Sequence, residues 1–274
     1  MPFDIIDTVI LISLSIIMGG LFGSFTTALV YRLPRGIPVA FGRGAKKGGD
    51  ESGVARSYCT GCNHQLGAFD LFPVLSFLCL RGKCRYCGAP YGKQYFLIEL
   101  CSVALSLMIF LFWGLSLKSF VALCAVPVLL ALLFIDLEHF ILPNILVFLL
   151  FVIGVVFRLF IDGAGISVAS LLALGFDVVV FGATSFLIGF IFSKILRKDT
   201  LGLGDVKFYM AASVWLGGMI LPIFMILSGV LGVLHGGVMR LRHGAVVFPF
   251  GPSLIIALVI CYLFKDAFYV YFYG

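Results

Sequence analysis

Two aspartates stand in a chain that is otherwise so apolar that most of it must lie in lipid. Asp136 closes the apolar run 126–135, and Asp205 follows two glycines in the segment 201–207, directly before another apolar stretch. A charged side chain costs roughly 2.5–3.5 kcal/mol at the centre of a membrane helix and less near the interface, so acids in such positions are functional candidates. If both carboxylates face the same side of the membrane, they can form an acid/base pair, because close carboxylates share a proton while one of them stays ionised.

Four cysteines in the segment 58–90 have the spacing of a metal site. They form two C-x2-C pairs separated by 21 residues, Cys59 with Cys62 and Cys84 with Cys87. This spacing is one residue longer than the usual zinc ribbon and predicts a structural zinc site, because four thiolates close the metal shell. Reduced or redox-active thiols are the alternative. A disulfide framework is disfavoured in a reducing cytoplasmic loop.

The composition defines the elements that must position these residues. Hydrophobic residues make up 62% of the 274-residue chain and charged residues 12%, with a mean hydropathy of +1.17. Soluble domains average about 45–50% apolar residues and about 25% charged residues, so we predict an all-α polytopic membrane protein with a zinc-ribbon-like insertion. At about 20 residues per crossing, the apolar stretches allow about eight transmembrane helices. They are 5–30, 97–117, 119–137, 144–161, 167–193, 205–218 (short for a full crossing), 220–238 and 247–268.

The distribution of positive charge predicts the topology. Ten of the 19 Lys and Arg residues lie in the polar segment 32–96, and further clusters lie at 194–207 and 240–242. Cytoplasmic loops collect Lys and Arg, and eight spans with an external N-terminus place all three basic regions in the cytoplasm. Both aspartates then lie near the cytoplasmic face. We interpret the basic regions as orientation signals that also contact anionic lipid, with no nucleic-acid partner. The first span carries Asp4 and Asp7 and is expected to be an anchor, not a cleaved signal peptide.

Other acids could compete with the two aspartates or assist them. Asp205 could also be the N-cap of its helix. Glu99 lies at the cytoplasmic interface and could help to shape the site, whereas Asp177 lies toward the external half and is expected to hydrogen-bond between helices. Glu138 and His139 offer a metal alternative, which we disfavour because Glu138 points away from Asp136 on a helix.

The remaining histidines and cysteines have simpler interpretations. His235 and His243 are expected to be interfacial. Cys79 has leucines on both sides and is expected to be buried. The segment 36–56 is rich in glycine and is predicted to be a flexible linker. Three further cysteines are predicted to be small core residues: Cys101, Cys124 and Cys261.

With these residues in place, the chain resembles the type IV prepilin peptidases, membrane aspartic proteases that process pilins and type II secretion pseudopilins. The specific signal is G-x-G-D-x-K at 202–207 combined with an upstream aspartate and four cysteines, and the resemblance covers nearly the whole chain. The matching segments are both cysteine pairs and 23–25, 31–35, 72–77, 80–84, 98–100, 136–137, 142–143, 202–207 and 249–252.

The resemblance implies a bacterial inner-membrane enzyme that cleaves a short basic leader after a glycine at the cytoplasmic face. The catalytic pair would be Asp136 and Asp205, and the substrate a prepilin or pseudopilin. The cysteine-bearing loop is characteristic of members that also methylate the new N-terminus with S-adenosylmethionine. The implied organisation is a first helix at 1–31, a cytoplasmic loop at 32–96 and a transmembrane peptidase core at 97–274.

Three places depart from the family pattern and three rival functions stay open. Asn144 stands where the family commonly has Asp, Phe77 stands where it commonly has Trp, and the segment 92–96 deviates. The first rival is a peptidase without methylation. The second is a transporter that uses the buried acids to move ions, and the third is a secretion scaffold without enzymatic activity.

Overall fold

The computed structural model describes residues 5–37, 58–59, 61–67, 76, 79–90, 92–163, 165–197, 201–243 and 248–273. Most of the predicted linker 36–56 and ten of the 21 residues between the two cysteine pairs lie outside these residues. The chain divides into two compact units, Met1–Ala131 and Leu132–Gly274. The boundary falls inside the helix α4 (Leu117–His139), which contributes its last turns to the second unit.

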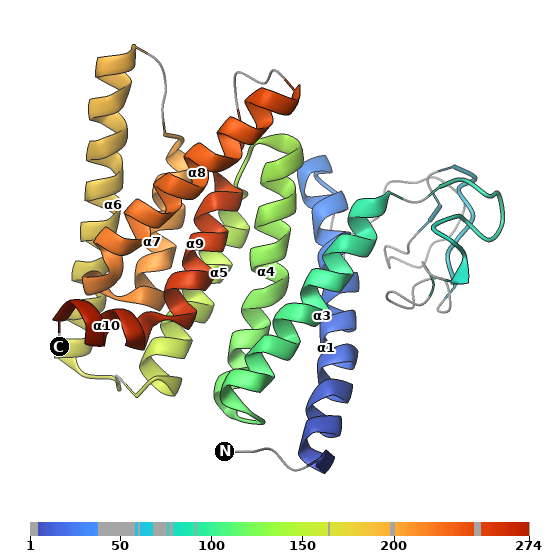
Figure 1. The fold of residues 1–274 in the computed structure, drawn as a ribbon, viewed down its shortest axis with the longest axis horizontal. Helices are drawn as coiled ribbons and strands as arrows, with labels where there is room; N and C mark the ends of the chain where they lie inside the picture. The colour runs from blue at the N-terminus through green and yellow to red at the C-terminus, as the bar shows by residue number, and fades with distance from the viewer. Residues whose placement is uncertain are drawn as a thin grey trace. The chain divides into compact units, whose positions relative to one another are not determined.

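The first unit contains two long helices that pack along each other, α1 (Ile5–Arg32) and α3 (Lys93–Trp113), and η1 (Leu33–Arg35) follows α1 (Figure 1). Two glycines of α1 allow the close approach. A Cβ atom on Gly19 would lie 2.6 Å from the Cα of Val103, and one on Gly23 would lie 2.8 Å from the Cα of Glu99. Small residues at such contacts are typical of helix pairs in membranes, because association there depends on close packing.

The second unit is a helical bundle built around one short, central helix. Eight residues of α7 (Leu203–Leu216) are buried, and α7 packs against α5, α6 and α9. The part at 208–216 is almost entirely buried and largely apolar all round, as a helix segment surrounded by protein requires. The surrounding elements are α5 (Asn144–Val156), the π-helical turn η3 (Phe157–Ile161), α6 (Val168–Leu196), η4 (Gly218–Ile220), α8 (Leu221–His243), α9 (Gly251–Leu263) and α10 (Lys265–Tyr273).

The helices of this unit run up and down, so their ends gather in two groups. Figure 1 shows the C-terminal ends of α4, α6 and α8 at one end of the unit, together with the N-terminal ends of α5, α7 and α9. The turns from α5 to α6 and from α7 to α8 lie at the other end, with α10. Asp136 in the last turn of α4 and Asp205 in the first turn of α7, far apart in sequence, therefore lie at the same end.

The structure confirms a polytopic all-α membrane protein. Each of the eight predicted segments contains a helix, and within the described residues six helices are long and apolar enough to cross a membrane, or seven if α9 and α10 form one span bent by 70°. The segment predicted at 205–218 is the exception. It is α7, whose 14 residues extend about 21 Å at 1.5 Å per residue, and most of its residues from Phe208 onward are buried by protein.

Candidate active site and metal centre

Asp205 lies in the first turn of α7. The N-cap of this helix is Gly202, and Asp205 occupies the third helical position, so the expectation that Asp205 itself is the N-cap is wrong by three residues. Its Oδ2 atom accepts a hydrogen bond of 3.0 Å from the Gly202 N–H, which still satisfies a free donor at the helix start. Burial raises the pKa of Asp205 to about 6, the Gly202 N–H opposes this, and the charge of Asp136 adds to it.

Asp136 lies in the last turns of α4 and is 5% exposed. Its Oδ2 atom accepts a hydrogen bond of 2.8 Å from the N–H of Gly251, which is the first residue of α9. The positive end of a helix dipole and its free N–H groups favour an anion at this position. Asp136 is therefore held at the N-terminus of one helix, as Asp205 is held at the N-terminus of another.

The structure brings the two aspartates into one electrostatic environment, since the charge of Asp136 acts on Asp205. Two contacts between α7 and the chain that follows α4 support this arrangement. The Lys207 Nζ atom of α7 donates a 2.9 Å hydrogen bond to Oδ1 of Asn144, the first residue of α5. A Cβ atom on Gly204 would lie 3.5 Å from the Cβ of Leu142. The first turn of α7 therefore packs against the turn that follows α4.

His235, which the sequence analysis expected to be interfacial, is one more group at this end. It lies on α8 close enough to Asp136 for the two side chains to interact electrostatically, a relation that the sequence analysis did not predict. Its Nδ1 atom is buried and has no hydrogen-bond partner among the described residues. No local sequence signal marks it, because its neighbours in space come from α4 and from the segment before α9. Glu99 belongs to the first unit.

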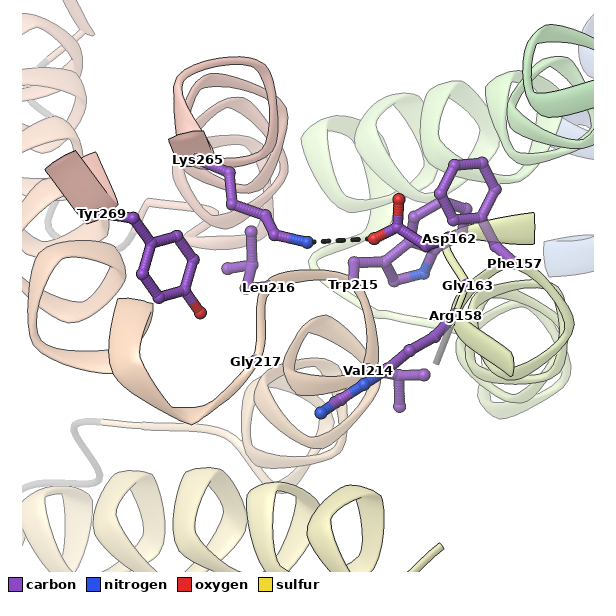
Figure 2. A pocket seen from close by; sticks show the side chains of 10 residues that line it. All are labelled: Phe157, Arg158, Asp162, Gly163, Val214, Trp215, Leu216, Gly217, Lys265 and Tyr269. Atoms are coloured by element: carbon purple, nitrogen blue, oxygen red, sulfur yellow. Dashed lines mark hydrogen bonds and ion pairs between the residues drawn. The ribbon is translucent and has the colours of Figure 1, made fainter. Parts of the chain in front are cut away.

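The other end of the second unit holds a second buried acid, Asp177 of α6, which is 7% exposed. Asp177 forms a 2.7 Å ion pair with Arg158 of η3, so the expected contact between helices is confirmed. A pocket of about 250 Å³ lies beside this pair. Figure 2 shows Arg158 lining the pocket, with Lys265 of α10 joined to Asp162 by a 3.1 Å ion pair.

The cysteine segment consists of two similar turns, which we call knuckles. In the first, the Cys59 N–H donates to the His64 carbonyl and the Asn63 N–H donates to the Cys59 carbonyl, both at 2.9 Å. In the second, the Cys84 N–H donates to the Ala89 carbonyl at 2.8 Å, and the Gly88 N–H donates to the Cys84 carbonyl at 2.9 Å. Asn63 and Gly88 occupy equivalent positions with φ of 56° and 70°, a conformation that these two residue types tolerate.

The knuckles bring four sulfur atoms together in a geometry that fits zinc. The Sγ atoms of Cys59, Cys62, Cys84 and Cys87 all lie within 4.8 Å of one another. Cys59 and Cys87 are 3.8 Å apart, which matches the spacing of about 3.8 Å for two thiolates on a tetrahedral zinc with Zn–S bonds of about 2.3 Å. Among the described residues these four cysteines form the only such group of potential metal ligands.

The other cysteines and the alternative metal ligands take no part in a site. Cys79 is exposed, so its predicted burial is wrong. Of the three predicted core cysteines, Cys261 is buried, Cys101 is half-buried and Cys124 is exposed. The latter two lie on α3 and α4, where an apolar surface faces lipid as readily as protein. Glu138 and His139 lie 3.8 Å from each other, and the part of the chain that the structure describes offers no third ligand beside them.

Comparison with known proteins agrees with this architecture. The sequence model of the bacterial peptidase A24 N-terminal domain matches residues 17–114, and that of the type IV leader peptidase family matches residues 122–237. The chain is 36% identical to a prepilin leader peptidase/N-methyltransferase of Aeromonas hydrophila over 78% of the chain and 73% of that protein. It is 32% identical to the protein of that name from Pseudomonas aeruginosa over 92% of the chain and 90% of the relative, and 30% identical to one from Pseudomonas putida over 94% and 92%. No solved structure matches the chain.

Proposed function

Because the chain belongs to the type IV leader peptidase family, we propose that it is an aspartic endopeptidase that removes the leader of a type IV prepilin or a type II secretion pseudopilin. The observation that carries this proposal is the pairing of Asp136 and Asp205 at one end of the second unit. Each carboxylate accepts a backbone N–H at a helix start. Among the described residues no ion pair neutralises either of them.

In this mechanism the two carboxylates divide the work of acid and base. We assign the proton that the pair shares to Asp205, which then donates a hydrogen bond to the carbonyl oxygen of the scissile bond. Asp136, stabilised as an anion by the Gly251 N–H, accepts a proton from water as the water oxygen attacks the carbonyl carbon. Collapse of the tetrahedral intermediate breaks the C–N bond, and the leaving amine takes up a proton from the pair.

The membrane placement explains why such a pair suits this substrate. The chain is a multi-pass protein of the bacterial inner membrane. We place the end of the second unit that holds Asp136 and Asp205 at the cytoplasmic face. Basic residues gather near this end, at the C-terminal end of α6 (Lys194, Arg197) and of α8 (Arg240, Arg242), as cytoplasmic ends require. At the other end Arg158 and Lys265 are both ion-paired. A leader in the cytoplasm would then meet the catalytic pair where the pilin helix leaves the lipid.

The same proposal includes methylation of the new N-terminus. The relatives carry N-methyltransferase in their names. When bound, S-adenosylmethionine would supply a methyl group to the new amine, which loses a proton, and S-adenosylhomocysteine would leave. This half of the proposal rests on the relatives and on the cysteine segment, and we assign no residue to the methyl donor.

Cleavage of a purified prepilin in proteoliposomes tests the proposal. We expect wild type to release the leader and the variants Asp136→Asn and Asp205→Asn to leave the substrate intact at wild-type protein levels. Mass spectrometry of the processed N-terminus then decides between the bifunctional enzyme, which adds one methyl group when S-adenosylmethionine is present, and a peptidase alone. Persistent cleavage in both variants would disprove the aspartate mechanism.

We further propose that zinc, held by Cys59, Cys62, Cys84 and Cys87, joins the two knuckles. Such a site contributes folding free energy directly, because the unfolded segment cannot hold the metal. Metal analysis of purified protein should find one zinc per chain, and Cys59→Ser or Cys84→Ser should lose it. Cys79→Ser is the matched control, since Cys79 is an exposed cysteine outside the cluster. Full zinc content in Cys84→Ser would contradict the assignment.

A further inference from the structure

The segment that leads into α9 contacts Asp136 but lies outside the residues that the leader peptidase family model matches, 122–237. It runs from Phe248 to Gly251 and reaches Asp136 from 115 positions away in sequence. Its role in the molecule follows from how it packs on α8 and from the hydrogen bond that the N–H of its last residue, Gly251, donates to Asp136.

Two glycines of α8 form the seat. Gly232 and Gly236 are four residues apart and so share one face of the helix. A Cβ atom on Gly232 would lie 2.6 Å from Cε2 of Phe250, and one on Gly236 would lie 2.6 Å from Cε1 of Phe248. The two aromatic rings therefore rest directly on the backbone of α8, and a side chain at either glycine would displace the ring that it meets. The ring of His235 meets Phe248 edge-on, with ring centroids 6.2 Å apart.

The amide of Gly251 is a free donor that this seating aims at Asp136. The first N–H groups of a helix have no partner within the helix, and Pro252 contributes none. The next two residues, Ser253 and Leu254, donate to the Phe250 carbonyl, which leaves the Gly251 N–H for the Asp136 carboxylate at 2.8 Å. The fit also excludes a side chain, because a Cβ atom on Gly251 would lie 2.6 Å from Oδ2 of Asp136.

We propose that the segment Phe248–Gly251, seated on Gly232 and Gly236, is a positioning element that holds the Asp136 carboxylate in its productive orientation through the Gly251 amide. The inference rests on the proposed peptidase function for its catalytic consequence, but the positioning itself is a structural relation. A displacement of about 1 Å in a reacting group can cost about 100-fold in rate. We therefore expect damage to the seat to lower kcat for leader cleavage and to leave KM unchanged, because the segment would act on the carboxylate and not on substrate binding.

Four glycines of α8 provide a matched test that does not depend on activity. Gly229→Ala and Gly237→Ala are the controls, since a Cβ atom at either position meets nothing within 4 Å. Hydrogen-exchange mass spectrometry of a peptide covering 248–254 reports mainly on four amides, because Pro249 and Pro252 have none. We expect faster exchange in this peptide for Gly232→Ala and Gly236→Ala than for wild type and both controls. Equal exchange in all four variants would overturn the inference, whatever the substrate of the enzyme.

The catalytic consequence is tested by rescue. Gly232→Ala should lower kcat by about 10–100-fold relative to Gly229→Ala, and adding Phe250→Leu, which shortens the ring that the new methyl group meets, should recover most of this loss. If Gly232→Ala cleaves as fast as Gly229→Ala, or if the double variant stays as slow as the single one, the seat does not position Asp136. If wild type itself cleaves no prepilin, the proposed function fails while the exchange comparison still decides the positioning.

Discussion

The second unit buries two carboxylates at its two ends and treats them in opposite ways. Asp177, 7% exposed, is neutralised by Arg158 at 2.7 Å. Asp136, 5% exposed, has a backbone amide as its hydrogen-bond donor and a second aspartate nearby. Burial alone therefore does not distinguish them, and what differs is the partner that compensates the buried charge.

The difference separates an acid that stabilises the fold from an acid that can react. An ion pair keeps both of its members charged. Protonating the acid or deprotonating the base would leave the charge of the other member unpaired in a low-dielectric interior. A carboxylate held by one N–H beside another carboxylate can exchange its proton, since the pair shares it. A transporter that moves ions through its buried acids would need Asp177 as much as Asp205. The Arg158 partner argues against that rival.

The largest expected effect is on cleavage. Asp136→Asn removes the base and should lower the rate of leader cleavage by roughly 10²–10⁴-fold, the usual contribution of a positioned acid/base group. Asp177→Asn is the matched substitution at the other end and should change the rate per folded molecule by less than about threefold. Initial rates, normalised to folded protein, check this. Equal losses in the two variants would remove the distinction between the ends and favour the transporter.

Stability should respond in the reverse order. Asp177→Asn leaves the guanidinium of Arg158 buried without its counterion, and breaking one side of a buried pair typically costs 3–5 kcal/mol. Asp136→Asn removes a charge that no ion pair among the described residues neutralises, and it should cost much less. Thermal unfolding in one detergent compares the two directly. Asp177→Asn combined with Arg158→Met should recover part of the loss, and a double variant as unstable as the single would show that the pair is not what stabilises this end.

Asp205 adds a pH dependence. Because its folded pKa is raised to about 6 from 3.8, the folded state binds this proton more tightly than the unfolded state. Its contribution to stability is therefore complete below about pH 4 and is lost as the pH rises through about 6. We expect Tm to fall over this interval in wild type, by about 2–4 °C for each kcal/mol lost, and Asp205→Asn to remove that part of the slope. A slope unchanged in Asp205→Asn would place the titrating group elsewhere.

The contrast between Asp205 and Asp136 also shows what the sequence could reveal. The hydrogen bond from Gly202 to Asp205 spans three residues, and the G-x-G-D-x-K segment predicts a helix start there, although it misplaces the cap. The hydrogen bond from Gly251 to Asp136 spans 115 positions, and no local pattern predicts it. The basic clusters predicted that both aspartates lie on the same side of the membrane, because Lys and Arg collect in cytoplasmic loops and so indicate the orientation of each helix.

Two other outcomes follow from the same division between local and long-range information. The cysteine spacing predicted the two knuckles, because each knuckle is a local turn around its C-x2-C pair. The apolar segment of α7 was predicted as a membrane span, yet other helices bury most of its residues from Phe208 onward. Hydropathy measures how apolar a segment is and cannot tell whether lipid or other helices surround it. For the same reason the sequence placed Cys124 in the core although its side chain is exposed.

The smallest expected effect comes from the second ion pair at the Asp177 end, Lys265 with Asp162. Their side chains are 25% and 27% exposed, against 23% and 10% for Arg158 and Asp177. Partly exposed pairs contribute about 0–1 kcal/mol, because water and salt screen the charges. Lys265→Met should therefore lower Tm by no more than a few degrees, with less effect at 1 M salt. A loss of Tm as large as that of Asp177→Asn would mean that the charge of the two members, and not their burial, sets the strength of these ion pairs. The contrast between the buried structural acid Asp177 and the buried reactive acid Asp136 would then rest on the presence of Arg158 alone.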